Sequence, residues 1–176
     1  DRYSTKFGSY VPNPDLKAES SVNYEVGVEQ KLSDAHVAKV ALFLSQSDDY
    51  IASVSVPAVA GFCTGGCNQS QNIGKEEHKG VEVSLDSLWD EYLTSSVSYT
   101  YIDAEIKDNP ISPYVTNMPK HSFAGRLKYS PIATVDIIPQ IRYESERYVR
   151  NEAIYSDYLT KDFFLMDLKV AYRPLK

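Results

Sequence analysis

The sequence predicts an all-β chain, an antiparallel meander of about seven strands that forms part of a large transmembrane β-barrel. Apolar and polar residues alternate with a period of two over seven separate stretches, and this period gives a strand one apolar and one polar face. The connections between these stretches are alternately short and long. Tyrosine accounts for 14 of the 176 residues, and its amphipathic ring suits the aromatic girdles of membrane barrels.

Each predicted strand follows from this alternation. In the first strand the even positions include Tyr24, Val26 and Val28, whereas the odd positions include Glu25 and Glu29. The other strands repeat the pattern, although the second is less polar on its second face. The predicted strands cover residues 22–32, 36–46, 79–86, 92–105, 123–130, 135–144 and 164–172.

The connections decide between a membrane barrel and a soluble sandwich. Short links lie near residues 34, 90 and 131, whereas the stretches 53–75, 107–117 and 147–160 are long and rich in turn-forming or polar residues, which predicts loops. Outer-membrane barrels sort their turns in this way, with short turns at the periplasmic rim and long loops outside. Because barrels of this kind have even strand numbers, seven strands indicate an excerpt of a larger barrel.

The chemistry of the two faces predicts which one meets lipid. A charged side chain facing hydrocarbon costs about 2 to 4 kcal/mol at mid-membrane. The charged residues expected to line the interior are Glu25, Glu29, Glu82, Asp86, Arg126, Lys128, Arg142 and Glu144. The apolar residues expected to meet lipid are Tyr24, Val26, Val28, Val81, Val83, Tyr99, Leu127, Ile137, Ile141 and Leu168. In a soluble sandwich the same two sets would be surface and core.

The composition excludes other classes of protein. With 43% hydrophobic residues and 2 cysteines, the chain is neither disordered nor a disulfide-rich mini-protein. A formal charge of -6 argues against a nucleic-acid partner. No apolar run approaches the roughly 18 residues of a membrane helix. The sequence contains no G-x-S-x-G, H-E-x-x-H or phosphate-loop motif, so we expect no enzyme.

Three motifs resemble those of the TonB-dependent outer-membrane receptors. Residues 13–19, Asn-Pro-Asp-Leu-Lys-Ala-Glu, are followed by a Glu-x-Gly-x-Glu strand at 25–29 and are similar to the family's NPxLKxE stretch. Residues 72–82 resemble the family's N-x-x-K/R-x-x-x-x-G-x-E pattern at the start of a strand. Residues 117–121 resemble the point after an outer loop where a strand begins.

The resemblance implies a function for the chain as part of a larger receptor. Residues 1–176 would be a partial β-barrel domain from the C-terminal half of a 22-stranded barrel in the bacterial outer membrane, without the plug and the closing strands. The receptor would take up a ferric siderophore or a similar metal chelate, in contact with outer-membrane lipid and with TonB through the missing plug and box region. The fragment itself would bind no cofactor. The alternative is a surface-binding, non-transporting β-domain, either a soluble sandwich or an adhesin-like barrel.

Two groups of residues are candidates for specific roles. Cys63 and Cys67 flank a Gly-Gly pair in the longest loop, which predicts a disulfide, with a metal or redox site as the alternative. The candidate ligand-binding residues, at the outer rim and its loops, are Arg142, Arg147, Tyr148, Arg150 and Tyr155. Arginine binds anions through charge-assisted hydrogen bonds and tyrosine stacks on rings. The competing interpretation is an aromatic girdle with wall charges that pair with each other.

Overall fold

The structure is a computed structural model that describes residues 10–61, 63–107, 114–151 and 156–174. Within these ranges the chain is all-β, with twelve strands and no helix, and thus has no helix that could span a membrane. The chain divides into two units, which we describe separately. Unit 1 comprises Asp1–Asn23, Ser45–Glu77 and Glu105–Tyr114, and unit 2 comprises Tyr24–Leu44, His78–Ala104 and Val115–Lys176.

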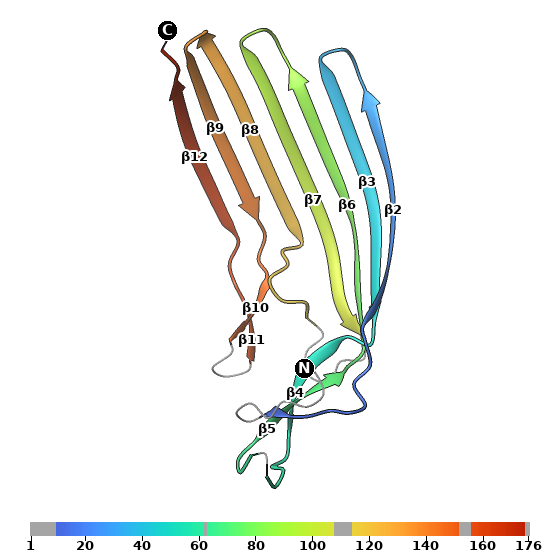
Figure 1. Cartoon of the computed structure of the whole chain (residues 1–176). Coiled ribbons are helices and arrows are strands. Elements are labelled where there is room, and N and C mark those ends of the chain that lie inside the picture. Colours follow the sequence, from blue (N-terminus) through green and yellow to red (C-terminus); the bar gives the residue numbers. More distant parts are fainter. Residues whose placement is uncertain (1–9, 62, 108–113, 152–155, 175–176) are drawn as a thin grey trace. The chain divides into compact units, whose positions relative to one another are not determined.

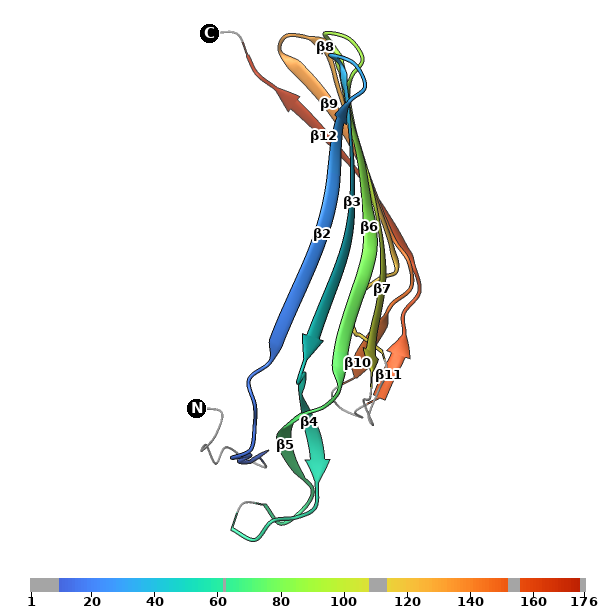
Figure 2. The same cartoon turned by 90° about the vertical axis from the view of Figure 1, so that its right-hand side faces the viewer.

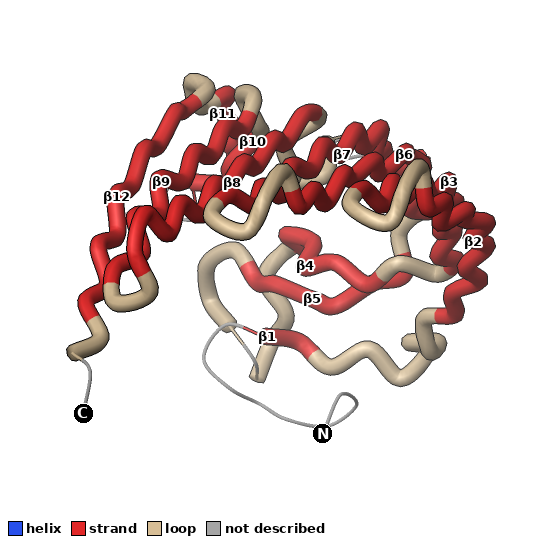
Figure 3. The backbone as a smooth tube through the Cα atoms, turned by 90° about the horizontal axis from the view of Figure 1, so that it is seen from above, coloured by secondary structure: helices blue, strands red, loops and turns tan. Residues whose placement is uncertain are grey.

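Seven long strands form one sheet, as the sequence predicts. Their order is β12-β9-β8-β7-β6-β3-β2, so each long strand lies beside the next long strand in the chain (Figure 1). Seen along the strands, the sheet is a single layer (Figure 3). Its strands are β2 (Ser20–Lys31), β3 (His36–Asp48), β6 (Lys75–Leu88), β7 (Leu93–Lys107), β8 (His121–Ile132), β9 (Val135–Glu144) and β12 (Phe163–Tyr172).

The register of unit 2 aligns the predicted apolar residues in rows across β7, β8, β9 and β12. Neighbouring rows are two residues, or about 7 Å, apart along a strand. The row nearest the long connections is entirely aromatic. The rows, taken toward the short turns, are Tyr99–Phe123–Tyr143–Phe164, Val97–Gly125–Ile141–Met166, Ser95–Leu127 beside Pro139–Leu168, and Leu93–Tyr129–Ile137–Val170. Tyr172, opposite Val135, closes this face at its other end.

The apolar face is open and therefore is not the core of a sandwich. Val26 in β2 and Leu168 in β12 are 65% and 68% exposed, and Val83 in the inner strand β6 is 40% exposed. Figure 2 shows this sheet from its β2 edge. A soluble sandwich would bury these side chains against a second sheet, so the structure corrects the sandwich alternative.

Unit 1 corrects the prediction of a loop over residues 53–75. This stretch contains β5 (Cys67–Asn72), which pairs antiparallel with β4 (Ile51–Val56) and parallel with β1 (Tyr10–Val11). The predicted third strand also begins earlier, at Lys75 instead of residue 79. β5 was not predicted because Asn, Gln and Ser dominate it and no apolar alternation marks it, whereas the part of β4 at residues 53–56 alternates but is too short to stand out beside the Gly-rich residues that follow.

The predicted loop over residues 147–160 is also partly wrong. It contains a short antiparallel pair, β10 (Tyr148–Asn151) with β11 (Ser156–Leu159), within unit 2. Of the predicted loop at 107–117, residues 108–113 lie outside the described part of the chain. Glu105, which precedes these residues, forms an isolated antiparallel bridge with Tyr114, which follows them.

Candidate functional site: the polar face of the sheet

The polar face of unit 2 carries the charged residues that the sequence assigns to an interior. Arg126 lies opposite Gln140, Arg142 lies opposite Ala124, and Glu144 lies opposite Ser122. Lys39 of β3 and Glu29 of β2 form an ion pair of 2.9 Å across their strands. The separation into an apolar and a charged face, predicted from the period of two, is therefore confirmed for these residues.

A buried carboxylate organises the end of this face that lies nearest the long connections. Glu144, the last residue of β9, is 8% exposed. Its carboxylate accepts hydrogen bonds from the guanidinium of Arg142, two residues earlier on the same strand face, and from that of Arg147 at 2.6 Å. The Arg147 guanidinium also lies over the ring of Phe163, 5.8 Å from its centroid. A carboxylate this deeply buried requires such partners.

The other candidate ligand-binding residues lie on the β10–β11 pair or near it. Arg150 donates to the carboxylate of Asp157 at 3.0 Å, from one strand to the facing position of the other. The carbonyl oxygen of Tyr148 accepts a hydrogen bond of 2.7 Å from the amide of Asn117. Tyr155 lies outside the described residues. The structure thus brings Arg142 and Arg147 together at one carboxylate and places Arg150 in a separate ion pair.

The charges of these groups define what the cluster can bind. Two guanidiniums and one carboxylate leave a net charge of +1 around Glu144, whereas Arg150 and Asp157 cancel. The side chain of Arg142 is 62% exposed, and a guanidinium carries five N–H donors in a rigid fork. The cluster can therefore hold one anionic oxygen or a planar anionic group while Glu144 fixes the orientation of both arginines.

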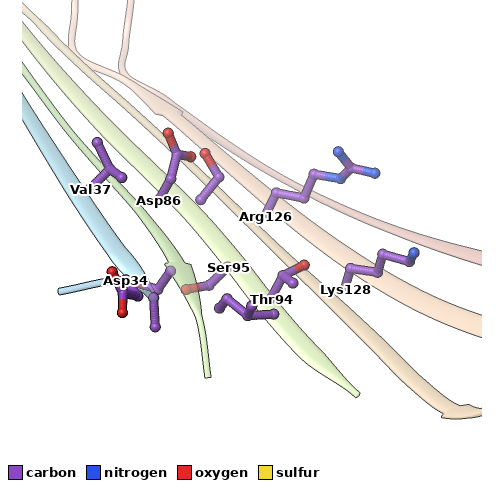
Figure 4. Close-up of a pocket in the computed structure, with 11 residues that line it drawn as sticks. Asp34, Val37, Asp86, Thr94, Ser95, Arg126 and Lys128 are labelled. Carbon is purple, nitrogen blue, oxygen red and sulfur yellow. The ribbon is translucent and has the colours of Figure 1, made fainter. Parts of the chain in front are cut away.

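A second polar feature lies near the short turns. A pocket of about 340 Å³ is lined by Asp34 from the turn between β2 and β3, Asp86 of β6, and Arg126 and Lys128 of β8. Figure 4 shows these side chains. Within β8, Lys128 lies six residues, or about 20 Å, from Ser122, which faces Glu144. Arg126 lies only two residues from Ala124, which faces Arg142, so the pocket extends toward the Glu144 cluster.

A second buried carboxylate with hydrogen-bond donors around it lies near the short turns, at the same end of the sheet as the pocket. Asp136 is 4% exposed and accepts hydrogen bonds from Ser130 at 2.7 Å and Arg173 at 2.5 Å. Asp136 was not among the residues that the sequence pointed to as a candidate site. The signal available was its position at the start of a strand on the charged face.

Other sequence candidates acquire structural roles. Cys63 and Cys67 are joined by a disulfide, with a Cα–Cα distance of 6.0 Å. In the described part of the chain, no three His, Cys, Asp or Glu residues are grouped as a metal site. The ring of His121 accepts or donates a hydrogen bond of 2.8 Å with the hydroxyl of Tyr99.

Comparison with known proteins identifies the family. Residues 1–176 match the family described as "TonB dependent receptor-like, beta-barrel". An iron-regulated outer membrane virulence protein of Vibrio cholerae is 28% identical over 94% of this chain and 26% of its own length. An uncharacterized TonB-dependent receptor of Haemophilus influenzae is 24% identical over 92% of this chain and 47% of its own length. The chain therefore spans about a quarter of the first of these relatives.

Solved structures show the same fold. The ferric enterobactin receptor PfeA of Pseudomonas aeruginosa superposes with a TM-score of 0.73 at 21% identity, over 94% of this chain and 25% of that one. The ferric-catecholate import receptor Fiu of Escherichia coli gives 0.69 at 18% identity, over 98% of this chain and 24% of that one. Both of these solved proteins are named as receptors. The chain belongs to the TonB-dependent receptor β-barrel family and is a segment of a β-barrel of the bacterial outer membrane.

Proposed function

We propose that the receptor containing this chain takes up a ferric siderophore or a similar metal chelate, with TonB as its energy-coupling partner through regions outside residues 1–176. The names of the relatives support iron chelates as cargo, since they include an iron-regulated outer membrane protein and a ferric enterobactin receptor. The exposed apolar rows support contact with outer-membrane lipid. The segment itself holds no resident cofactor in this proposal.

The observation that carries the proposal is the Glu144 cluster on the polar face. Ferric chelates of this kind present anionic oxygens, and Arg142 and Arg147 offer orientated donors beside a net positive charge. Arg150, Tyr148 and Tyr155 are proposed to add contacts from the β10–β11 segment. Because Glu144 already fixes both guanidiniums, little side-chain entropy is lost when an anion binds.

A matched pair of variants tests the role of the arginines. The full-length receptor is expressed in an iron-limited strain that lacks its own uptake receptors, and growth and binding are measured with defined ferric chelates. In the double variant R142A/R147A, loss of charge-assisted hydrogen bonds worth about 1.5 to 3 kcal/mol should weaken binding roughly 10- to 150-fold. The control is Arg173→Ala, since Arg173 also pairs with a buried carboxylate but lies near the short turns.

The results separate the proposal from its alternatives. Unchanged chelate affinity in R142A/R147A would remove the arginines from the cargo site, and equal losses in R173A would indicate a general effect of charge. If the wild-type receptor supports growth on none of the ferric chelates yet binds to surfaces, the adhesin-like, non-transporting alternative is correct.

A further inference from the structure

Two segments that resemble family motifs meet in unit 1, although more than 50 residues separate them in the chain. The side-chain oxygen of Asn72 accepts the amide of Lys17 at 2.8 Å, and its nitrogen donates to the Lys17 carbonyl at 3.1 Å. The same nitrogen donates to the carbonyl of Asp49 at 2.7 Å. The Asn72 side chain therefore bonds to both backbone groups of Lys17, as a neighbouring strand would, and at the same time to the backbone carbonyl of Asp49.

The contact lies at a double bend between strands. β3 passes into β4 through Asp49, whose φ of 58° is in the left-handed region, and β5 passes into β6 through Gly74, whose φ is 69°. A non-glycine residue adopts this region only at a cost in energy. The amide of Tyr50 donates to the Gly74 carbonyl, and the amide of Ile73 donates to the Tyr50 carbonyl. We call this two-stranded bend, residues 49–50 and 73–74, the joint.

The segment Pro12–Glu19, which we call the strap, is fixed to the neighbouring hairpin. Asn13 donates to the Ser70 carbonyl at 2.8 Å and caps its own turn by accepting the amide of Asp15. Leu16 in the middle of the strap is 6% exposed. The carboxylate of Glu19 accepts the amide of Ile51, the first residue of β4, at 2.7 Å.

The hairpin that the strap contacts is a distinct element. We call β4, β5 and the disulfide-closed connection between them the arm, residues 51–72. It is attached to the rest of unit 1 through the joint, through the strap, which continues directly into β2, and through β1, which pairs with β5. A hairpin attached through a bend alone could pivot, whereas one with a second attachment is held at one angle.

We propose that Asn72 is a positioning residue that clamps the joint, and that through it the strap holds the arm at a fixed angle to the ends of β3 and β6. Asn72 bonds both to the strap, at Lys17, and across the joint, at Asp49. The motif residues Asn13, Glu19 and Asn72 then serve loop geometry and not cargo binding. This inference does not depend on the identity of the cargo.

The full-length receptor in lipid vesicles provides the test. Nitroxide labels are attached through encoded keto amino acids at Thr64 in the arm and Ser47 at the end of β3, so that the native disulfide stays intact, and the distance distribution is measured by pulsed EPR. Hydrogen exchange of the joint amides is followed in parallel. The control is Ser55→Ala, because the Ser55 hydroxyl donates to the side-chain oxygen of Asn68 within the arm and, in the described part of the chain, makes no hydrogen bond to the strap.

In Asn72→Ala we expect a distance distribution at least twice as broad as that of the wild type and at least tenfold faster exchange at Tyr50 and Ile73. The amides within β4 and β5 should keep their protection, and S55A should match the wild type. Asn72→Asp, which retains the acceptor for Lys17, should be intermediate. An unchanged distribution in N72A overturns the proposal. Equal loss of protection throughout the arm would also overturn it, since Asn72 would then maintain the fold of the arm and not its angle.

Discussion

Leu168 offers the sharpest test of which face of the sheet meets lipid. It lies on β12 beside Pro139, in the middle of the apolar rows, and is 68% exposed. On the same face of the strand, Phe164 lies four residues before it and Tyr172 four residues after it. These aromatic residues bracket an apolar segment of about 27 Å along the strand, which at a tilt of 35 to 45° is about 20 Å of membrane thickness.

The expected cost of Leu168→Arg follows from this central position. An arginine on the lipid face at the bilayer midplane costs about 2 to 4 kcal/mol, which lowers the folding equilibrium constant roughly 30- to 1,000-fold. The matched control is Asp167→Arg, one residue away on the polar face, where it lies opposite Gln140. A substitution on a water-exposed face should change stability by no more than about 0.5 kcal/mol.

The assay is reversible unfolding of the full-length receptor in lipid vesicles, with the folded fraction read from the mobility of unheated samples on gels. We expect L168R to shift the denaturant midpoint strongly and D167R to leave it nearly unchanged. Equal shifts in the two variants, or a loss below about 0.5 kcal/mol in L168R, would refute the assignment of this face to hydrocarbon.

Two further predictions concern a close backbone approach and the disulfide. In Gly80→Ala the new methyl group would overlap the carbonyl oxygen of Tyr101. We therefore expect a loss of about 1 to 3 kcal/mol in unfolding free energy in the same assay. The control is Gly65→Ala, whose methyl group meets nothing within 4 Å and should leave the stability unchanged. Replacing Cys63 and Cys67 by serine opens a five-residue loop whose closure is worth about 2 kcal/mol at most. Protease should cut this loop faster, and the loss in unfolding free energy should not exceed that amount.

The strands of the large sheet were predictable because each one carries its own signal. Alternation with a period of two indicates that a segment is extended, and it also indicates which side chains share a face. The predicted strand at 135–144 coincides with β9, whereas β6 extends beyond its predicted limits in both directions. The extra residues of β6 include Glu76 and Glu77, where charge on both faces breaks the alternation.

The short strands were not predictable in this way because they depend on their partner strands and carry no pattern of their own. β5 is rich in Asn, Gln and Ser, and it pairs both with β4 and with the distant β1. β10 and β11 have four residues each, and the ion pair of Arg150 with Asp157 joins facing positions of the two strands. Neither segment has a periodic apolar face that would identify it.

The candidate site was predictable in composition but not in its arrangement. Arg142 and Glu144 are two residues apart on a predicted strand, so their shared face, and hence their ion pair, could have been inferred. The approach of Arg147 to the same carboxylate depends on how the chain leaves β9, which no local pattern specifies. The contact between Asn72 and Lys17 could not be predicted either, because the sequence contains the two motifs but does not indicate that they bind each other.

Polar side chains accept hydrogen bonds from backbone amides where the hydrogen bonding between strands is interrupted. Ser145, just after β9, accepts the amide of His121 through its hydroxyl, and Glu19, just before β2, accepts the amide of Ile51. A backbone donor that loses its strand partner must find another acceptor, and a short polar side chain fixed by its own neighbours supplies one at little entropic cost. The motif residues at positions 13, 19 and 72 are therefore expected at the ends of strands, where they determine how a long connection leaves the sheet. The apolar rows between the aromatic residues require no specific residues, only the alternation of apolar and polar side chains.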